Sequence, residues 1–158
     1  MCDCGADPTY RFDDLANLIR LARIDQALEI SEDPGVFEVE ALAPYFGRVQ
    51  DFKLTSKARE KADYKRCAIL LNVRNKQGDL TSRILLLKPN LIAGLPVDLV
   101  NYASEHPTFP NESTANQFFD EAQFEGYRQL GLQIGRRLFG DGKEESKVAD
   151  ALWKYLGY

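Results

Sequence analysis

The residues best suited to chemistry gather in one stretch, residues 109–131 (FPNESTANQFFDEAQFEGYRQLG). Four carboxylates lie there beside a tyrosine and an arginine: Glu112, Asp120, Glu121, Glu125, Tyr127 and Arg128. Such groups can exchange protons with a substrate, so a small hydrolase using this cluster is one hypothesis. The spacing of Glu121, Glu125 and Arg128 also places them on one helix face, where they could form an ionic ladder. We favour this second interpretation, a capped and salt-bridged helix.

Other motifs for chemistry are weak in this sequence. The Gly-x-Ser-x-Gly motif of serine hydrolases does not occur, nor do glycine-rich phosphate loops. His106 is the only histidine, and we interpret it as a helix-terminal residue near free carbonyl groups. Cys2, Cys4 and Cys67 are expected to be free thiols. We therefore expect no catalytic residue, no metal site and no cofactor.

Size and charge limit the class of protein. A chain of 158 residues with 44% hydrophobic residues suits a single domain over residues 1–158. The net charge of −4 argues against nucleic-acid binding, which requires clustered Lys and Arg. No apolar run is long enough for a transmembrane segment, and the residues after Met1 do not form a signal-peptide pattern. We therefore expect a cytoplasmic protein.

The elements that must position these residues follow from periodicity. Helical spacing predicts helices over about 12–25, 96–106, 118–139 and 144–156, and the third begins at a capping box at 114–117. Two apolar runs, 67–73 and 82–88, predict an antiparallel hairpin, and shorter strands are expected within 26–30 and 36–42. The glycines of Gly-x-x-x-Gly, Gly131 and Gly135, are expected to permit close helix packing. Core positions are expected to include Phe118, Tyr127, Leu130 and Trp153. The fold class is α+β, or a partial α/β fold, with a short sheet packed against about four helices.

Three separated segments resemble one known family. They are residues 3–25 (DCGADPTYRFDDLANLIRLARID), 83–114 (RILLLKPNLIAGLPVDLVNYASEHPTFPNEST) and 116–131 (NQFFDEAQFEGYRQLG). In sequence and in order they are similar to the C-terminal part of bacterial patatin-like phospholipases. That resemblance implies a relation to lipid acyl hydrolysis by a Ser-Asp dyad. The serine motif and the aspartate motif of the dyad do not occur here, so no catalytic role is carried over to Asp3.

The resemblance implies a non-catalytic accessory domain. If the chain corresponds to a C-terminal region without its catalytic core, surfaces that once met the core would be exposed, and self-association as a dimer would cover them. One alternative is a subunit that completes a separately encoded patatin-like lipid acyl hydrolase. The other is the small hydrolase based on Glu112, Asp120, Glu121, Glu125, Tyr127 and Arg128.

Overall fold

A three-stranded antiparallel sheet and the helices around it form the described part of the chain. The computed structural model describes residues 7, 10–52, 64–113, 118–141 and 146–158. The sheet has the order β1 (Glu29–Glu32), β2 (Ala68–Arg74), β3 (Leu80–Leu87). Five α-helices are found among the described residues: α1 (Asp13–Gln26), α2 (Val49–Phe52), α4 (Val97–Glu105), α5 (Glu121–Phe139) and α6 (Lys147–Leu156). The predicted α+β class is confirmed.

The predicted hairpin is present as β2 and β3. The strands pair from Ala68 opposite Leu87 to Arg74 opposite Leu80, with an irregularity beside Val73. Asn75 shapes the connection, because its side-chain oxygen accepts the N–H groups of Gln77 (3.0 Å) and Asp79 (2.9 Å). β2 is buried along its first six residues, which explains why its sequence shows no polar–apolar alternation.

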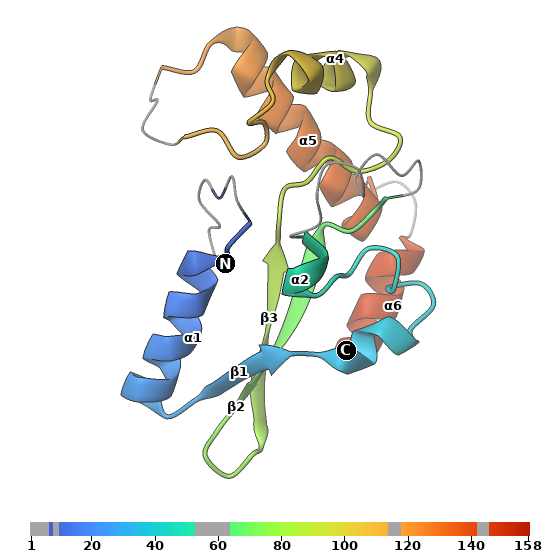
Figure 1. Ribbon diagram of the computed structural model, residues 1–158. Helices are drawn as coiled ribbons and strands as arrows, with labels where there is room; N and C mark the ends of the chain where they lie inside the picture. Colours follow the sequence, from blue (N-terminus) through green and yellow to red (C-terminus); the bar gives the residue numbers. More distant parts are fainter. Residues whose placement is uncertain (1–6, 8–9, 53–63, 114–117, 142–145) are drawn as a thin grey trace.

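The two faces of the sheet pack against different helices (Figure 1). Leu15 of α1 joins one cluster with Ile69 and Leu71 of β2. The residue between them in the strand, Leu70, points to the other face, where it packs in a cluster with Leu152 of α6. α1, predicted over 12–25, thus covers one face, and α6 covers the other.

The strand expected within 36–42 is wrong. A 3₁₀ helix, η1 (Pro34–Glu38), and a turn occupy these residues instead. Asp33 starts the helix by accepting the N–H of Gly35 at 3.1 Å, and Pro34 fixes the backbone of its first position. Val36 and Leu42 are buried from this turn, so the apolar spacing that resembled a strand comes from an irregular segment.

The start of α5 also differs from the prediction. Asp120 is the N-cap, and its side chain accepts the N–H of Gln123 at 2.7 Å. The proposed capping box at 114–117 lies outside the described residues. Phe118 is 92% exposed, so its expected place in the core is wrong, whereas the burial of Leu130 is confirmed. A three-residue offset in the helix start therefore moves one large side chain from the core to the surface.

The last helix is α6, and its inner stripe is narrower than expected. Ser146 caps it by accepting the N–H of Ala149 at 3.2 Å. Val148 and Leu152 are buried, as the pattern predicts, but Trp153 is 48% exposed and contacts the ring of Tyr158 edge-on. The tryptophan therefore lies at the border of the stripe.

The close helix packing that Gly131 and Gly135 were expected to permit is not there. A Cβ atom at either position would have no neighbouring atom within 4 Å. Gly126, one turn earlier, makes the contact instead: a Cβ there would lie 3.0 Å from Cδ1 of Tyr102 in α4. Gly126 is therefore the residue that lets α4 approach α5.

Two further predictions concern the surface and the thiols. In the part of the chain that the structure describes, no helix combines the length and apolar character that crossing a bilayer requires. Cys67 is a free, buried thiol just before β2, and burial raises its pKa to about 12. Cys2 and Cys4 lie outside the described residues.

Alanine substitutions in α5 should separate these glycines. Gly131→Ala should raise the free energy of unfolding by roughly 0.5–1 kcal/mol, the usual advantage of alanine inside a helix. Gly126→Ala has the same helical advantage but crowds the Tyr102 ring, so it should be less stable than Gly131→Ala. Urea denaturation of both variants measures the difference, and equal stabilisation would contradict this account of the α4–α5 contact.

Candidate functional site

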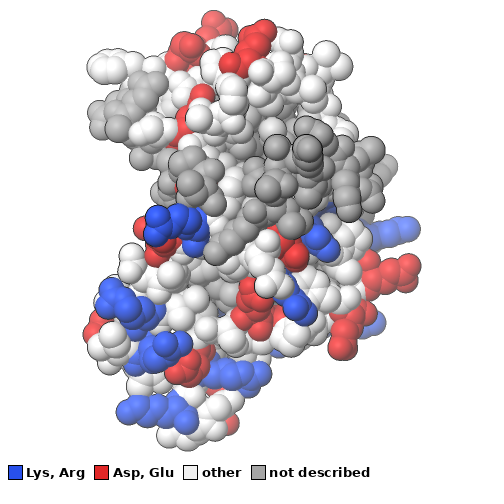
Figure 2. Space-filling model, viewed as in Figure 1, with Lys and Arg blue, Asp and Glu red and all other residues white. Residues whose placement is uncertain are grey.

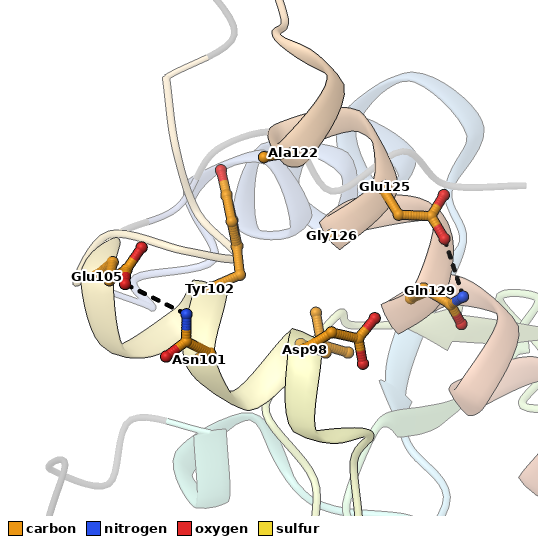
Figure 3. A pocket seen from close by; sticks show the side chains of 9 residues that line it. Asp98, Asn101, Tyr102, Glu105, Ala122, Glu125, Gly126 and Gln129 are labelled. Carbon is orange, nitrogen blue, oxygen red and sulfur yellow. Dashed lines mark hydrogen bonds between the residues drawn. The ribbon is translucent and has the colours of Figure 1, made fainter.

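A groove between α4 and α5 is the hollow nearest to the candidate residues (Figure 3). Its volume is about 290 Å³, and its polar lining includes Asp98, Asn101, Tyr102, Glu105, Glu125 and Gln129. The amide groups in the lining bond to its carboxylates. Asn101 donates to Glu105 at 3.2 Å and Gln129 donates to Glu125 at 2.9 Å. The polar groups on each wall therefore satisfy one another along their own helix.

The end of the molecule formed by α4 and α5 is acidic. Residues 97–129 carry six carboxylates and one arginine, and Figure 2 shows acidic side chains at this end of the molecule. Most Lys and Arg side chains visible in that view lie over the opposite end. The field of this surface therefore attracts cations and repels anions.

The expected ionic ladder is present as one pair. Glu125 accepts two hydrogen bonds from Arg128, each 2.7 Å long, across one turn of α5. These bonds lower the pKa of Glu125 from 4.5 to about 2. Glu121 is exposed in the first turn, and Asp120 caps the helix. This part of the cluster stabilises α5 locally.

Glu112 has a different environment from the other candidates. Its side chain is 15% exposed and lies 3.6 Å from Nδ1 of His106, between Glu112 Oε1 and the ring nitrogen. Gln123 donates to Glu112 Oε2 at 3.0 Å, and the N–H of Glu112 donates to the hydroxyl of Tyr127 at 3.2 Å. The carboxylate therefore links the end of α4 to α5.

His106 does more than the sequence predicted. Its N–H donates to the carbonyl of Tyr102, as in an ordinary helix end, but its ring stacks on the Tyr102 ring with centroids 4.0 Å apart. Phe109 contacts the rings of both Tyr102 (5.1 Å) and Tyr127 (4.9 Å) edge-on. These aromatic contacts hold residues 106–112 against both helices.

The two tyrosines of this cluster are poor proton donors. Burial, followed by the negative charge of Glu112, raises the pKa of Tyr102 to about 12. Burial likewise raises the pKa of Tyr127 to about 12. Both hydroxyls therefore stay neutral at physiological pH, where they can bond to Glu112 without competing for its charge.

The structure thus divides the six predicted site residues into two groups. Glu112 and Tyr127 lie inside, with His106, Gln123 and Tyr102, which sequence reasoning did not include. Asp120, Glu121, Glu125 and Arg128 cap, charge and staple α5 at its surface: they are listed here only to complete the set. Helical spacing found the Glu125–Arg128 pair, but the contact between His106 and Glu112 crosses a turn that no periodic pattern reveals.

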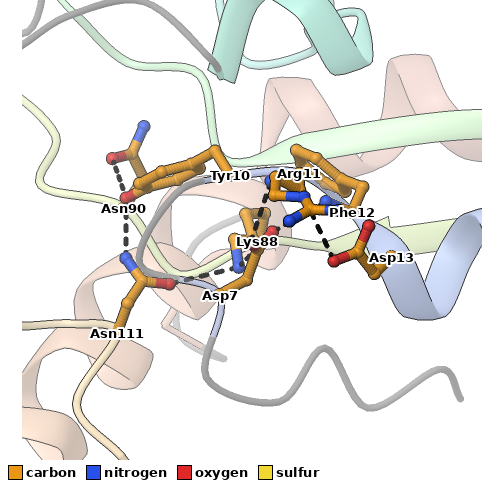
Figure 4. A network of polar contacts seen from close by, with 8 residues as sticks. All are labelled: Asp7, Tyr10, Arg11, Phe12, Asp13, Lys88, Asn90 and Asn111. Atoms are coloured by element: carbon orange, nitrogen blue, oxygen red, sulfur yellow. Dashed lines mark hydrogen bonds and ion pairs between the residues drawn. The ribbon is translucent and has the colours of Figure 1, made fainter.

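A second polar cluster, centred on Lys88, lies at the end of β3 (Figure 4). Lys88 is 1% exposed, yet it carries an ammonium group. Its Nζ atom donates to Asn111 Oδ1 at 3.2 Å and lies 3.8 Å from Asp7 Oδ2. The same nitrogen lies 5.1 Å from the ring centroid of Tyr10 and 5.5 Å from that of Phe12. The carboxylate, the amide and the two rings compensate for the lost hydration of the ammonium group.

Hydrogen bonds extend this cluster through its neighbours. Asn111 donates to the hydroxyl of Tyr10 at 2.9 Å, and Tyr10 donates to Asn90 at 3.4 Å. Asp7 accepts the N–H groups of Arg11 and Phe12 at 2.9 and 3.0 Å. The cluster therefore joins three parts of the chain: the residues before α1, the end of β3 and the connector to α5.

The Lys88 cluster also accounts for two unusual backbone conformations. Tyr10 and Phe12 have φ angles of 51° and 58°, in the left-handed region that disfavours side chains other than glycine. Their rings are nevertheless 3% and 5% exposed. Burial of both rings, with the bonds from Asp7, offsets the local strain.

Removing the charge at Lys88 should destabilise the whole fold. Lys88→Met keeps the length of the side chain but leaves Asp7 and Asn111 without the cation, which should cost roughly 2–4 kcal/mol of unfolding free energy. Lys76→Met, in the exposed hairpin turn, is the matched control and should change it by less than about 0.5 kcal/mol. Equal stability of the two variants by urea denaturation would show that Lys88 contributes no net stability.

The carboxyl group of Glu125 should titrate at about pH 2. Its folded pKa is below the unfolded value, so its contribution to stability is present above the unfolded pKa and is lost as the pH falls toward 2. In Arg128→Gln the pKa of Glu125 should rise toward its ordinary range. Carbon-13 NMR of the glutamate side chains measures both values, and an unchanged midpoint in Arg128→Gln would contradict the assigned cause.

Comparison with known proteins adds no family to this description. No family model, curated protein or solved structure matches the chain. The two clusters described above therefore carry the functional argument.

Proposed function

We propose that the chain is a non-catalytic interaction domain that associates with itself and is similar to the C-terminal part of patatin-like lipases. The Lys88 cluster is the observation that carries this proposal. Its members come from the segments that resemble that family: Asp7 and Tyr10 from the first, and Lys88, Asn90 and Asn111 from the second. These side chains bond to one another and hold distant segments together, which is a structural role.

The third segment contributes in the same way. Gln123 and Tyr127, from residues 116–131, hold Glu112 of the second segment. The residues that carry the resemblance are thus explained by the packing of one fold, without any reacting group. This supports a domain whose activity lies in what it binds.

Exposed apolar side chains support an interaction role. Several large ones are at least 45% exposed: Leu21, Ile24, Val97, Val100, Phe118, Phe119, Phe124 and Trp153. Single exposed apolar residues are ordinary, but a surface with this many favours association with another protein surface. A second copy of the chain is the simplest partner, because closed symmetric dimers are the commonest assemblies.

Light scattering during gel filtration tests this proposal. The expected result is a mass of twice 17.9 kDa at micromolar concentration, falling toward 17.9 kDa on dilution. A mass of 17.9 kDa at every concentration, up to the limit of solubility, would contradict self-association.

A second measurement addresses catalysis. The purified chain should release no fluorescent product from short- and long-chain acyl esters above the rate in buffer, because we assign it no nucleophile. Hydrolysis that a serine-reactive fluorophosphonate abolishes would overturn the non-catalytic assignment and favour the small-hydrolase hypothesis. Co-purification with a separate acyl hydrolase chain, in place of a dimer, would favour the subunit hypothesis.

A further inference from the structure

We propose that the open edge of β3 is the surface through which two copies associate. β3 of one copy would pair antiparallel with β3 of the other and join the two sheets into one of six strands. This inference rests on the proposed self-association and adds the interface and its register.

The edge is long and unoccupied within the described part of the chain. β3 ends the sheet in the order β1-β2-β3, and its eight residues compare with four in β1 at the other edge. An edge strand presents unpaired N–H and C=O groups that an extended chain can satisfy. Of its eight side chains only Arg83 is charged, so few charges oppose pairing.

The structure determines which backbone groups face this edge. The N–H of Lys88 donates to the carbonyl of Cys67 at 2.9 Å, so the backbone groups of Lys88 point toward β2. Backbone direction alternates along an antiparallel strand, and the register is regular from Leu87 back to Ser82. The N–H and C=O groups of Arg83, Leu85 and Leu87 therefore point away from β2, toward the open edge.

One register satisfies all three residues. If Leu85 lies opposite Leu85 of the second copy, Arg83 lies opposite Leu87 of the second copy, and the reverse. Every outward residue then belongs to a hydrogen-bonded pair, and the two-fold axis is perpendicular to the sheet. A shift that centres the pairing on Arg83 would place two arginines directly opposite each other, which is unfavourable.

A second copy suits this edge better than the acidic end of the molecule. A symmetric contact through α4 and α5 would bring two surfaces together that each carry six carboxylates and one arginine over residues 97–129. The β3 edge has no such repulsion. Its terminal leucines, Leu80 and Leu87, are 38% and 37% exposed, and pairing would shield Leu87 from water.

Charge at Leu87 tests the register. Leu87→Lys places a positive charge opposite Arg83 of the second copy, twice in each dimer, so the dissociation constant should rise about tenfold or more. Leu87→Glu is the matched control, since it places a negative charge there and should keep the dimer. Sedimentation velocity measures association of both variants and the parent, and thermal unfolding followed by circular dichroism verifies their fold.

Cross-linking gives a second and independent measurement. In a background with Cys2→Ser and Cys4→Ser, Leu85→Cys should form an intermolecular disulfide on mild oxidation, because paired Cα atoms lie about 5.5 Å apart. Leu87→Cys is the control and should remain uncross-linked, because the two copies of residue 87 lie four residues apart in this register.

The outcomes separate this inference from the proposed function. A dimer that Leu87→Lys weakens, that Leu87→Glu preserves and that Leu85→Cys traps supports the edge pairing. A dimer that responds equally to both Leu87 variants overturns the pairing but leaves self-association in place, and cross-linking of Leu87→Cys instead of Leu85→Cys overturns the register. A monomeric parent overturns both proposals.

Discussion

The arrangement of the chain depends on the burial of one cation, the ammonium group of Lys88. Removing such a group from water costs several kcal/mol unless charges, hydrogen bonds and aromatic faces replace its hydration. Asp7, Asn111 and the rings of Tyr10 and Phe12 supply these replacements from segments up to about a hundred residues away. The requirement therefore works as a geometric constraint: the cation is accommodated only when all the segments have assembled around it.

Local patterns predicted the elements whose causes are local. The hairpin follows from two apolar runs and an Asn–Gly-rich connection, and α1 follows from helical spacing. The failures have a common origin, because side chains at element ends decided the outcome. Asp33 converted an apparent strand into a 3₁₀ helix, and Asp120 took the cap that the sequence assigned to residues 114–117. Several residues nearby could cap a helix, and only tertiary packing selects among them.

The candidate site was predictable only where helix geometry determines the contacts. Glu125 and Arg128 are three residues apart in α5, so their pairing follows from spacing. His106 and Glu112 are joined across an irregular connector, and Tyr10 and Asn111 are 101 residues apart. No periodic signal encodes such contacts. The carboxylates that appeared as one cluster in the sequence therefore separate into a surface pair and a buried link between helices.

The Lys88 cluster also determines how the open edge of the sheet ends. The N–H of Lys88 continues the β2–β3 ladder, while its side chain turns into the cluster with Asp7 and Asn111. At the other end of β3, the irregularity beside Val73 interrupts the regular register. Regular outward-facing backbone is thereby confined to Arg83, Leu85 and Leu87, a length that admits few registers. The contact that orders the interior thus also limits how another strand could add to this sheet.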